Sequence, residues 1–427
     1  MKKVLMIAPY FVPRRRVGSQ RPFKFAIHLR DYGYEPVIVT IGTPGVSMTE
    51  NEKELLEGIE IITVQAPFDQ TVKKPSPEGE KKSLKGQYLL DWIDKHTPMD
   101  TWLFLFLTKY LSIKKRVTNV QPDLIWATGD PWSSLWLGEK LSRALEIPFI
   151  ADFRDPWTLS KLPLRNRSSF SEGVDMEIEK RIIHSANKLI FTALLTEYLY
   201  SEFYNLPEEK TATIYNSYAN TISDTEVDEW DADIDSESLN MIFFGQFRRL
   251  SPVKPIVKAL KILQKKNSEA SKRIKIHSFG KPDKPNMNMI TDAGLLQNFT
   301  FHEPVEPEKK GQVLKHADIL LLSTDEKREE VIPAKLWDYL SVHTPIFSIV
   351  PNPEVADIIM RTKAGVQVHP GEKMEIAALL ESFSIEKENR SNSLFMPESI
   401  LPDRGIYEAN QTTKQLASIF DEVLENG

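Results

Sequence analysis

The sequence predicts an α/β protein with two domains, each built around a doubly wound parallel sheet. Its 427 residues are enough for two hydrophobic cores. Short apolar runs alternate with amphipathic helical patterns, first over residues 4–216 and again over residues 241–369. Most runs are apolar throughout, which is typical of parallel strands that helices cover on both faces. The acidic stretch 223–238 separates the two series and marks the expected junction between the domains.

The first series predicts a domain over residues 1–225. It opens with a strand at residues 4–8 and a helix that follows Ser19 and ends at Gly33, where glycine suits a helix terminus. The other strands of this series are expected at residues 36–40, 59–64, 124–128, 148–153, 188–193 and 211–216. A helix is expected at residues 133–145, between two of these strands.

Residues 67–120 interrupt this alternation. They contain a stretch rich in Lys, Pro, Ser and Glu, followed by a segment rich in Trp, Phe and Leu. We interpret them as a helical insertion that packs against the first sheet. The alternative is a membrane-surface or acceptor-docking element, because basic residues lie beside the aromatic ones, namely Lys109, Lys114, Lys115 and Arg116.

The second series predicts a domain over residues 226–400. Its strands are expected at residues 241–245, 273–280, 300–305, 318–323, 345–350 and 365–369. Residues 401–427 contain a helix whose apolar residues, among them Leu416, Phe420 and Val423, recur at amphipathic spacing. That helix must therefore pack on another part of the protein.

Composition excludes several classes of function. The chain has 54 Lys and Arg against 60 Asp and Glu, a formal net charge of −6, which argues against nucleic acid as the main partner. It has 0 cysteines, which excludes disulfides, zinc–thiolate sites and cysteine nucleophiles and fits a reducing cytoplasm. No apolar run approaches the length of about 20 residues that a membrane-spanning helix needs.

Familiar catalytic motifs are also missing from the sequence. There is no His-Glu-x-x-His zinc motif, no phosphate-binding Walker loop and no Gly-x-Ser-x-Gly nucleophile turn. The loop at residues 16–21 lacks the Gly-x-Gly-x-x-Gly pattern of dinucleotide-binding folds. We therefore expect no metal and no bound cofactor. A ligand held in a central cleft between the two domains is the expected arrangement.

The segment from Asp325 to Leu340 contains the most informative pattern. It follows an expected strand and opens a helix near Pro333, a residue suited to a first helical turn. Such a helix start offers free N–H groups to phosphate, and Asp338 could accept hydrogen bonds from vicinal hydroxyls. The alternatives are ordinary ones: Glu330 as one more solvated charge, and Asp338 as the partner of Lys335 three residues away.

This segment resembles a motif of the retaining glycosyltransferase family 4. Seven residues separate Glu330 from Asp338, as in the Glu-x7-Glu element of that family, and a strand beginning at Pro345 follows. The family pattern has glutamate where this chain has Asp338.

Other parts of the chain resemble the same family in order and spacing. Asn216 resembles an Asn-Gly turn that ends the first domain, although Ser217 replaces the glycine. Phe243-Phe-Gly245 resembles the opening of the second domain, although Gln246 replaces the usual arginine. Residues 151–157 resemble the segment that carries a His-Asp pair in many members, here in an Arg-Asp-Pro-Trp form that resembles bacterial surface-polysaccharide enzymes.

The resemblance implies a GT-B fold, in which two Rossmann-like domains face a central cleft. It implies donor binding by the second domain, acceptor binding by the first, and a last helix that packs back on the first domain. The implied donor-binding residues are Gly18, Gly245, Arg248, Arg249, Lys254, Gly280, Val305, Lys335 and Asp338. The implied catalytic residues are Glu330, Arg154 and Asp155.

The implied reaction moves a sugar from a nucleotide-sugar donor to a glycan or lipid-linked acceptor, with retention of configuration and without metal. Arg and Lys side chains would meet the charge that grows on the departing diphosphate. The implied setting is cytoplasmic, with contact at the inner membrane face as a further alternative. Two rival functions stay open: a nucleotide-sugar epimerase or hydrolase of the same fold, and a non-catalytic nucleotide-sugar-binding protein.

Two groups of arginines have competing interpretations. Arg154 and Asp155 could form a catalytic pair or merely a structural ion pair at a strand end, and the sequence does not favour either. The loop residues Arg14, Arg15 and Arg16 could be solvated, or could contact an acceptor phosphate or anionic lipid.

Overall fold

The computed structural model describes residues 1–14, 16–66, 92–163, 167–219, 235–305, 309–389 and 404–426. These residues form two compact units, and each is described here by itself. Unit 1 comprises Met1–Asn216 and Ala409–Gly427, and unit 2 comprises Ser217–Glu408. The junction lies earlier than the expected boundary at residue 225, because Tyr218 pairs with Glu408 within unit 2.

Unit 1 contains a seven-stranded parallel sheet in the order β3-β2-β1-β4-β5-β6-β7. The strands are β1 Lys2–Ile7, β2 Tyr34–Ile41, β3 Glu60–Val64, β4 Leu124–Gly129, β5 Phe149–Phe153, β6 Lys188–Phe191 and β7 Thr211–Thr213. The chain starts in the middle of the sheet, builds outward to β3 and then returns to build the other half. This is the doubly wound order that the alternating pattern predicts.

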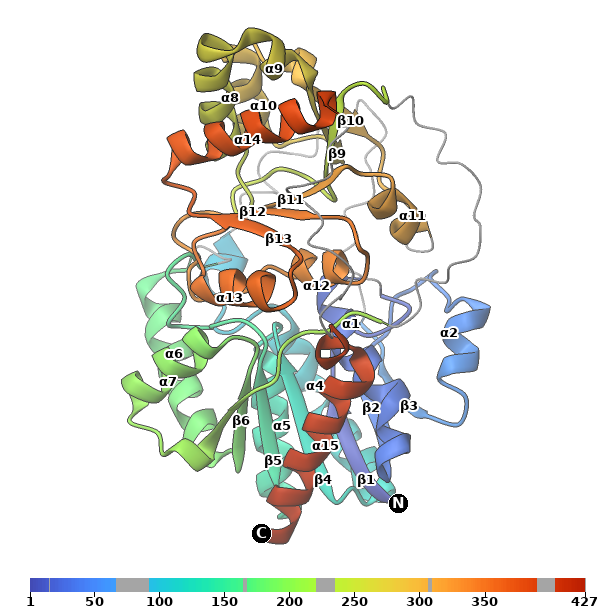
Figure 1. Ribbon diagram of the computed structural model, residues 1–427. Coiled ribbons are helices and arrows are strands. Elements are labelled where there is room, and N and C mark those ends of the chain that lie inside the picture. Colours follow the sequence, from blue (N-terminus) through green and yellow to red (C-terminus); the bar gives the residue numbers. More distant parts are fainter. Residues whose placement is uncertain are drawn as a thin grey trace. The chain divides into compact units, whose positions relative to one another are not determined.

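Helices cover both faces of this sheet (Figure 1). They are α1 Val17–His28, α2 Glu50–Leu55, α4 Trp102–Val120, α5 Ser133–Leu145, α6 Ser169–Ser185, α7 Leu194–Tyr204 and α15 Ala409–Asn426. On one face, Phe25 of α1 and Phe420 of α15 share a core with Met6 of β1. The C-terminal helix therefore belongs to the N-terminal unit, and the face it packs on is the one that α1 covers.

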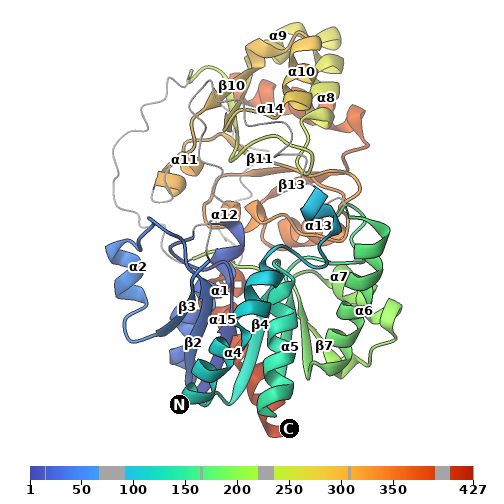
Figure 2. The ribbon, with the colours of Figure 1, turned by 180° about the vertical axis from the view of Figure 1, so that it is seen from behind.

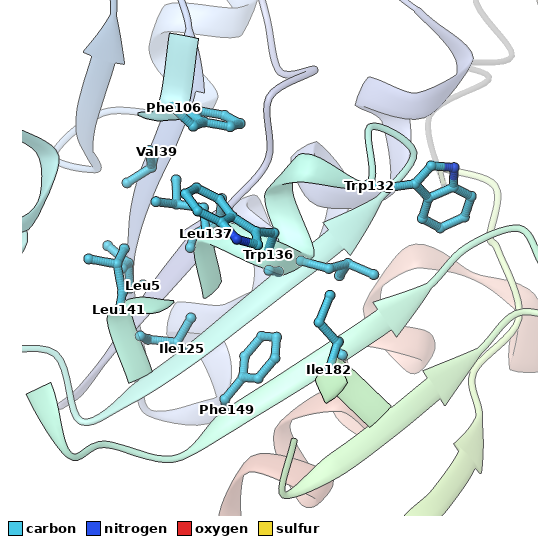
Figure 3. Close-up of a cluster of buried hydrophobic side chains, with 14 of the residues drawn as sticks. Leu5, Val39, Phe106, Ile125, Trp132, Trp136, Leu137, Leu141, Phe149 and Ile182 are labelled. Atoms are coloured by element: carbon cyan, nitrogen blue, oxygen red, sulfur yellow. The ribbon is translucent and has the colours of Figure 1, made fainter. Parts of the chain in front are cut away.

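The other face of the sheet carries α4, α5 and α6. Figure 2 shows α4 and α5 side by side on this face, where they are in contact. Their inner side chains, including Phe106 and Trp136, pack on Leu5, Val39 and Phe149 from the sheet (Figure 3). Residues 102–120 thus form a helix packed on the first sheet, whereas residues 67–91 of the expected insertion lie outside the described residues.

Unit 2 contains a six-stranded parallel sheet in the order β10-β9-β8-β11-β12-β13. The strands are β8 Leu239–Phe243, β9 Ile274–Phe279, β10 Phe299–His302, β11 Ile319–Ser323, β12 Ile346–Ile349 and β13 Gly365–Val368. The helices are α8 Lys254–Lys266, α9 Ser268–Arg273, α10 Lys284–Asp292, α11 Lys310–Lys315, α12 Lys335–Leu340, α13 Pro353–Arg361 and α14 Lys373–Glu388. Met241 and Ile242 point to opposite faces of β8 and are both fully buried, as a strand covered on both faces requires.

The predicted fold class is confirmed: the protein is α/β, with two doubly wound parallel sheets. A strand stands at each of the places where the sequence predicts one. The main differences are at strand ends. β10 ends at His302 rather than at residue 305, since Pro304 has no N–H group with which to continue the ladder.

Candidate functional site

The candidate site in unit 2 lies beyond the carboxyl ends of its parallel strands. In doubly wound sheets, ligands bind at this edge, where the loops that follow neighbouring strands converge. Gly245 follows β8, Gly280 follows β9, and Val305 lies in the segment after β10. The long segment from Thr324 to Ala334 follows β11 and leads into α12.

Two glycines shape the loops after β8 and β9. Gly245 has φ +125° and Gly280 has φ +121°, backbone conformations that favour glycine. The hydroxyl of Ser278 lies 3.2 Å from the carbonyl oxygen of Gly245 and 2.9 Å from that of Gly280. The hydroxyl has a single proton to donate, so the two carbonyls share it, and both turns lie close to Ser278 at the sheet edge.

Tyr339 on α12 fixes the start of the same loop. The backbone N–H of Phe244 donates to its hydroxyl oxygen at 3.0 Å, and that hydroxyl donates to the carbonyl of Leu321 at 3.1 Å. Tyr339 is fully buried, so these bonds are shielded from water. The loop after β8 and helix α12 are consequently held in a fixed relation.

Lys335 at the start of α12 lies against the Gly245 loop. Its Cε is 3.1 Å from the position that a Cβ on Gly245 would take, and its Nζ is 3.9 Å from the centroid of the Phe243 ring. Burial, and to a lesser extent the positive charge of Arg248, lowers the pKa of Lys335 to about 7. A side chain at Gly245 would therefore crowd Cε of Lys335.

Glu330 differs from the charged residues around it. Glu326, Lys327 and Glu329 are exposed, whereas Glu330 is 3% exposed. A solvated surface charge, the ordinary interpretation of this residue, does not fit that burial. A buried carboxylate at a sheet edge used for ligand binding is instead a candidate for contact with the ligand.

Two contacts hold the segment that carries Glu330 close to the loop after β8. The N–H of Asp325 donates to the carbonyl of Leu250 at 3.2 Å, and the hydroxyl of Ser323 donates to the carbonyl of Pro252 at 3.0 Å. The structure therefore brings together the loops of β8 and β11, which are about 80 residues apart in sequence but adjacent in the sheet.

Helix α12 differs from one sequence-based expectation and excludes one alternative. It begins at Lys335 rather than at Pro333, because the Pro333 carbonyl accepts the N–H of Leu336, three residues on, in a tighter turn. Asp338 pairs with Lys310 of α11, Nζ to Oδ1 at 2.6 Å, and not with Lys335, the partner that the alternative interpretation of this residue named. Both groups of this ion pair are partly exposed, at 30% and 32%.

The three other predicted donor-binding cations lie in or after the loop that follows β8. Arg248, Arg249 and Lys254 are exposed. Backbone bonds between Arg248 and Ser251 close a short turn, with N–O distances of 3.1 and 2.8 Å. Lys254 is the first residue of α8 and precedes Pro255, a residue that favours the first helical turn. Cationic side chains thus stand beside a helix start, an arrangement that suits an anion.

The predicted residues of unit 1 form a separate group. Gly18 in the first turn of α1 accepts a hydrogen bond from Nη1 of Arg154 at 3.1 Å, and Asp130 accepts one from Nη2 at 3.1 Å, both through their carbonyl oxygens. Asp155 Oδ2 lies 3.5 Å from Nε of Arg154. A side chain at Gly18 would clash with this guanidinium. Arg154 therefore links the first turn of α1 to the loop after β4.

A buried ion pair beneath this group is absent from the sequence-based expectations. Arg21 Nε lies 2.8 Å from Asp152 Oδ2, and Arg21 also donates to the carbonyl of Tyr215 at 3.0 Å. Asn216, expected to end the first domain, lies 3.4 Å from the same guanidinium through Oδ1. One feature of the sequence could have predicted that Arg21 is buried. Arg21 lies one helical turn before Phe25, on the buried face of α1.

The arginine loop of unit 1 is not uniformly solvated. Arg14 is buried, with its guanidinium 5.3 Å from the Trp102 ring, whereas Arg16 is exposed and 5.3 Å from the Tyr10 ring. Arg15 lies outside the described residues. Within the part of the chain that the structure describes, no three acidic or histidine side chains form a group able to hold a metal ion.

This geometry agrees with comparison to known proteins. Residues 224–393 match the family model of the glycosyl transferases group 1. The class of protein is thus defined: unit 2 carries a group 1 glycosyl transferase domain. The resemblance found in the sequence is confirmed for this domain, which is that of a glycosyltransferase. No curated protein sequence matches it.

Solved structures share the fold over the full length of the chain. HepE from Anabaena, in complex with UDP, has a TM-score of 0.60 and 13% identity, with 99% of this chain and 100% of that chain covered. Sucrose-phosphate synthase from Thermosynechococcus elongatus has a TM-score of 0.62 and 12% identity, with 100% of both chains covered. UDP-GlcNAc 2-epimerase from Methanocaldococcus jannaschii has a TM-score of 0.50 and 10% identity, with coverages of 99% and 100%. At these identities the similarity establishes the GT-B fold alone.

Proposed function

We propose that this enzyme transfers a sugar from a nucleotide-sugar donor to a glycan or lipid-linked acceptor, with retention of configuration and without a metal ion. The observation that carries the proposal is the packing of Lys335 against the Gly245 loop, with buried Glu330 on the adjacent loop. A cation and a shielded carboxylate are thereby presented at the sheet edge where a nucleotide-sugar would lie.

The diphosphate of the donor is assigned to the cations of unit 2. Arg248, Arg249, Lys254 and Lys335 would stabilise the negative charge that grows as the nucleoside diphosphate leaves. This is the reason that no metal ion is required in the proposal. Turnover that is lost in EDTA and restored by magnesium or manganese would contradict it.

The remaining contacts with the donor are divided among three parts of the site. Asp338 would accept hydrogen bonds from the ribose hydroxyls, and Gly280 and Val305 would border the base. Glu330 would accept hydrogen bonds from hydroxyls of the transferred sugar. Its burial supports this role, because a hydrogen bond to a carboxylate is stronger where water is excluded.

The chemical step needs no enzymic nucleophile. The bond from the anomeric carbon to the leaving phosphate oxygen breaks, and the acceptor oxygen forms its bond on the same face of the sugar. The acceptor proton passes to an oxygen of the leaving diphosphate. Every atom is accounted for by the donor and acceptor, and the protein contributes position and electrostatic stabilisation.

Unit 1 is assigned to the acceptor and to support of the site. Arg154 holds the carbonyl of Gly18, so we assign it the role of positioning the glycine loop, and Asp155 the role of orienting Arg154. The Arg-Asp-Pro-Trp form of residues 154–157 resembles enzymes of bacterial surface-polysaccharide assembly and supports a cytoplasmic role of that kind.

A donor assay with and without acceptor tests the proposed function. A thermal-shift screen with nucleotides and nucleotide-sugars identifies the donor, because a ligand that binds the folded state raises the midpoint temperature of unfolding. UDP-glucose comes first, since structures of HepE contain UDP and UDP-glucose. Sugar transfer that depends on acceptor supports the proposal. Epimerised donor, acceptor-independent hydrolysis, or binding without turnover would each contradict it.

A further inference from the structure

Helix α4 has two apolar faces, and only one of them is packed within unit 1. The side chains of its inner face, including Trp102, Phe106 and Val117, pack in the hydrophobic core between α4 and the sheet. On its outer face, Phe104, Leu107 and Leu111 are 56%, 51% and 79% exposed. Their spacing of three and four residues places them in one stripe along the helix.

The charge of α4 is opposite in sign to that of the whole chain. The helix carries Lys109, Lys114, Lys115 and Arg116 and no Asp or Glu, whereas the chain has a net charge of −6. Lys115 lies one turn after Leu111, so it continues the apolar stripe. A lysine side chain in this position can pack its methylene groups on an apolar surface while its ammonium group reaches phosphate groups.

Helix α7 in the same unit provides the contrast. Its outer face also exposes apolar residues, with Tyr198 64% and Phe203 55% exposed. Its charged residues are Glu197 and Glu202, and it has no Lys or Arg. Exposed apolar side chains therefore occur on both helices, but only on α4 do they accompany positive charge.

We propose that the outer face of α4 docks on an anionic bilayer surface. Phe104, Leu107 and Leu111 would enter the boundary between headgroups and acyl chains. Lys114 and Lys115, which lie seven and four residues after Leu107 and Leu111 and so on the same side of the helix, would contact lipid phosphates. None of the helices within the described ranges could cross a bilayer, so this contact is peripheral. The proposal goes beyond the transferase function, because it names a partner that is neither donor nor acceptor.

Charge complementarity favours a lipid surface over a second copy of the chain. Two copies of α4 packed through this face would bring Lys114 and Lys115 of each copy together, and α4 has no acidic residue to offset their charge. Such like-charge contact disfavours association. An anionic bilayer offers complementary charge to the same residues, in addition to a place for the apolar stripe.

The test is co-sedimentation of the full-length protein with vesicles of phosphatidylcholine alone or mixed equally with phosphatidylglycerol. Binding is expected on the mixed vesicles and at most weakly on the neutral ones, and it should weaken as salt rises. In the double variant Leu107→Gln/Leu111→Gln, the partition coefficient should fall about 10-fold or more. Lys114→Gln/Lys115→Gln should lower it roughly 10- to 30-fold on the mixed vesicles.

The matched control is Tyr198→Gln/Phe203→Gln, which removes two exposed apolar side chains from acidic α7. It should bind mixed vesicles like the wild type, and circular dichroism should show that all variants keep their helices. Equal binding to neutral vesicles, or an equal loss in the α7 variant, would overturn the proposal. So would a dimer in sedimentation velocity that the α4 variant abolishes, in a protein that does not bind vesicles.

Discussion

The Nζ of Lys335 lies 3.9 Å from the centroid of the Phe243 ring, at the junction of α12 and the loop after β8. A cation over an aromatic face is stabilised, whereas burial, and to a lesser extent the positive charge of Arg248, disfavours the protonated form. The pKa of Lys335 is lowered to about 7 as a result. The charge of this group therefore changes near neutral pH when no ligand is bound.

This shift predicts that donor binding depends on pH. The diphosphate of a nucleotide-sugar favours protonated Lys335, so affinity should be highest below the pKa of about 7 and should fall above it. A nucleotide-sugar is the ligand of choice because its own phosphates do not titrate in this range. Calorimetry in two buffers of different ionisation heat should show proton uptake on binding near neutral pH. Lys335→Met should remove this uptake, and an unchanged uptake in that variant would assign it to another group.

Lys254 provides a test of the diphosphate position. Lys254→Ala should weaken binding of the nucleoside diphosphate about 10- to 100-fold, through loss of a charge-assisted contact, and should hardly affect the nucleoside. Lys261→Ala, an exposed lysine of the same helix α8, is the matched control and should bind like the wild type. Equal losses for nucleoside and diphosphate would place the diphosphate elsewhere.

Asp338 tests the ribose contact. The side chain of Asp338 is one methylene, roughly 1.5 Å, shorter than the glutamate of the family pattern. To contact the ribose, either the helix must lie closer to the ribose or a water molecule must bridge the carboxylate and the hydroxyls. Asp338→Ala should weaken nucleoside diphosphate binding about 10- to 100-fold by loss of charge-assisted hydrogen bonds.

The ion pair of Asp338 with Lys310 adds a control to this experiment. Lys310→Ala removes the partner but keeps the carboxylate of Asp338. It should therefore lower the affinity for the nucleoside diphosphate less than Asp338→Ala does. The 2′,3′-dideoxy nucleotide should bind wild type and Asp338→Ala alike. If the natural nucleotide also binds both proteins equally, Asp338 serves only its pair with Lys310.

The buried pair of Arg21 and Asp152 predicts a large effect on stability. Burial raises the pKa of Asp152, and the contact with Arg21 opposes that shift. Asp152→Ala would leave the Arg21 charge buried without its carboxylate, so unfolding free energy should fall by about 3–5 kcal/mol. Urea denaturation measures this. Asp155→Ala, a change at a more exposed carboxylate of the same segment, should cost about 1 kcal/mol or less.

Much of the site follows from local sequence pattern. Gly245 and Gly280 stand directly after apolar strands, and parallel strands bring their carboxyl ends to one edge of a sheet. The segment from Glu330 to Asp338 follows the next strand and precedes a helix, so its place at the same edge could be predicted. The roles of these residues toward a donor stay predictions.

Contacts between distant parts of the chain could not be predicted in this way. Arg21 and Asp152 are 131 positions apart, and Lys310 and Asp338 are 28 apart. No periodicity specifies which charged side chain will meet another across such separations. The start expected for α12 at Pro333 is wrong for a related reason. The Pro333 carbonyl accepts the N–H of Leu336 in a three-residue turn, and the packing around the segment determines which turn forms.

The sequence by itself determined the α/β class and the places of the strands, because apolar periodicity is a local property of a chain. Its motifs also resemble those of a glycosyltransferase family, and the comparison confirms that resemblance for the second domain. Only the tertiary structure decided that Glu330 is buried, that Lys335 lies against Gly245, and that Arg154 holds the carbonyl of Gly18. It also decided that Phe104, Leu107 and Leu111 of α4 are exposed among the residues that the structure describes. Burial and pairing depend on which elements pack together, and packing is a property of the folded chain rather than of any segment.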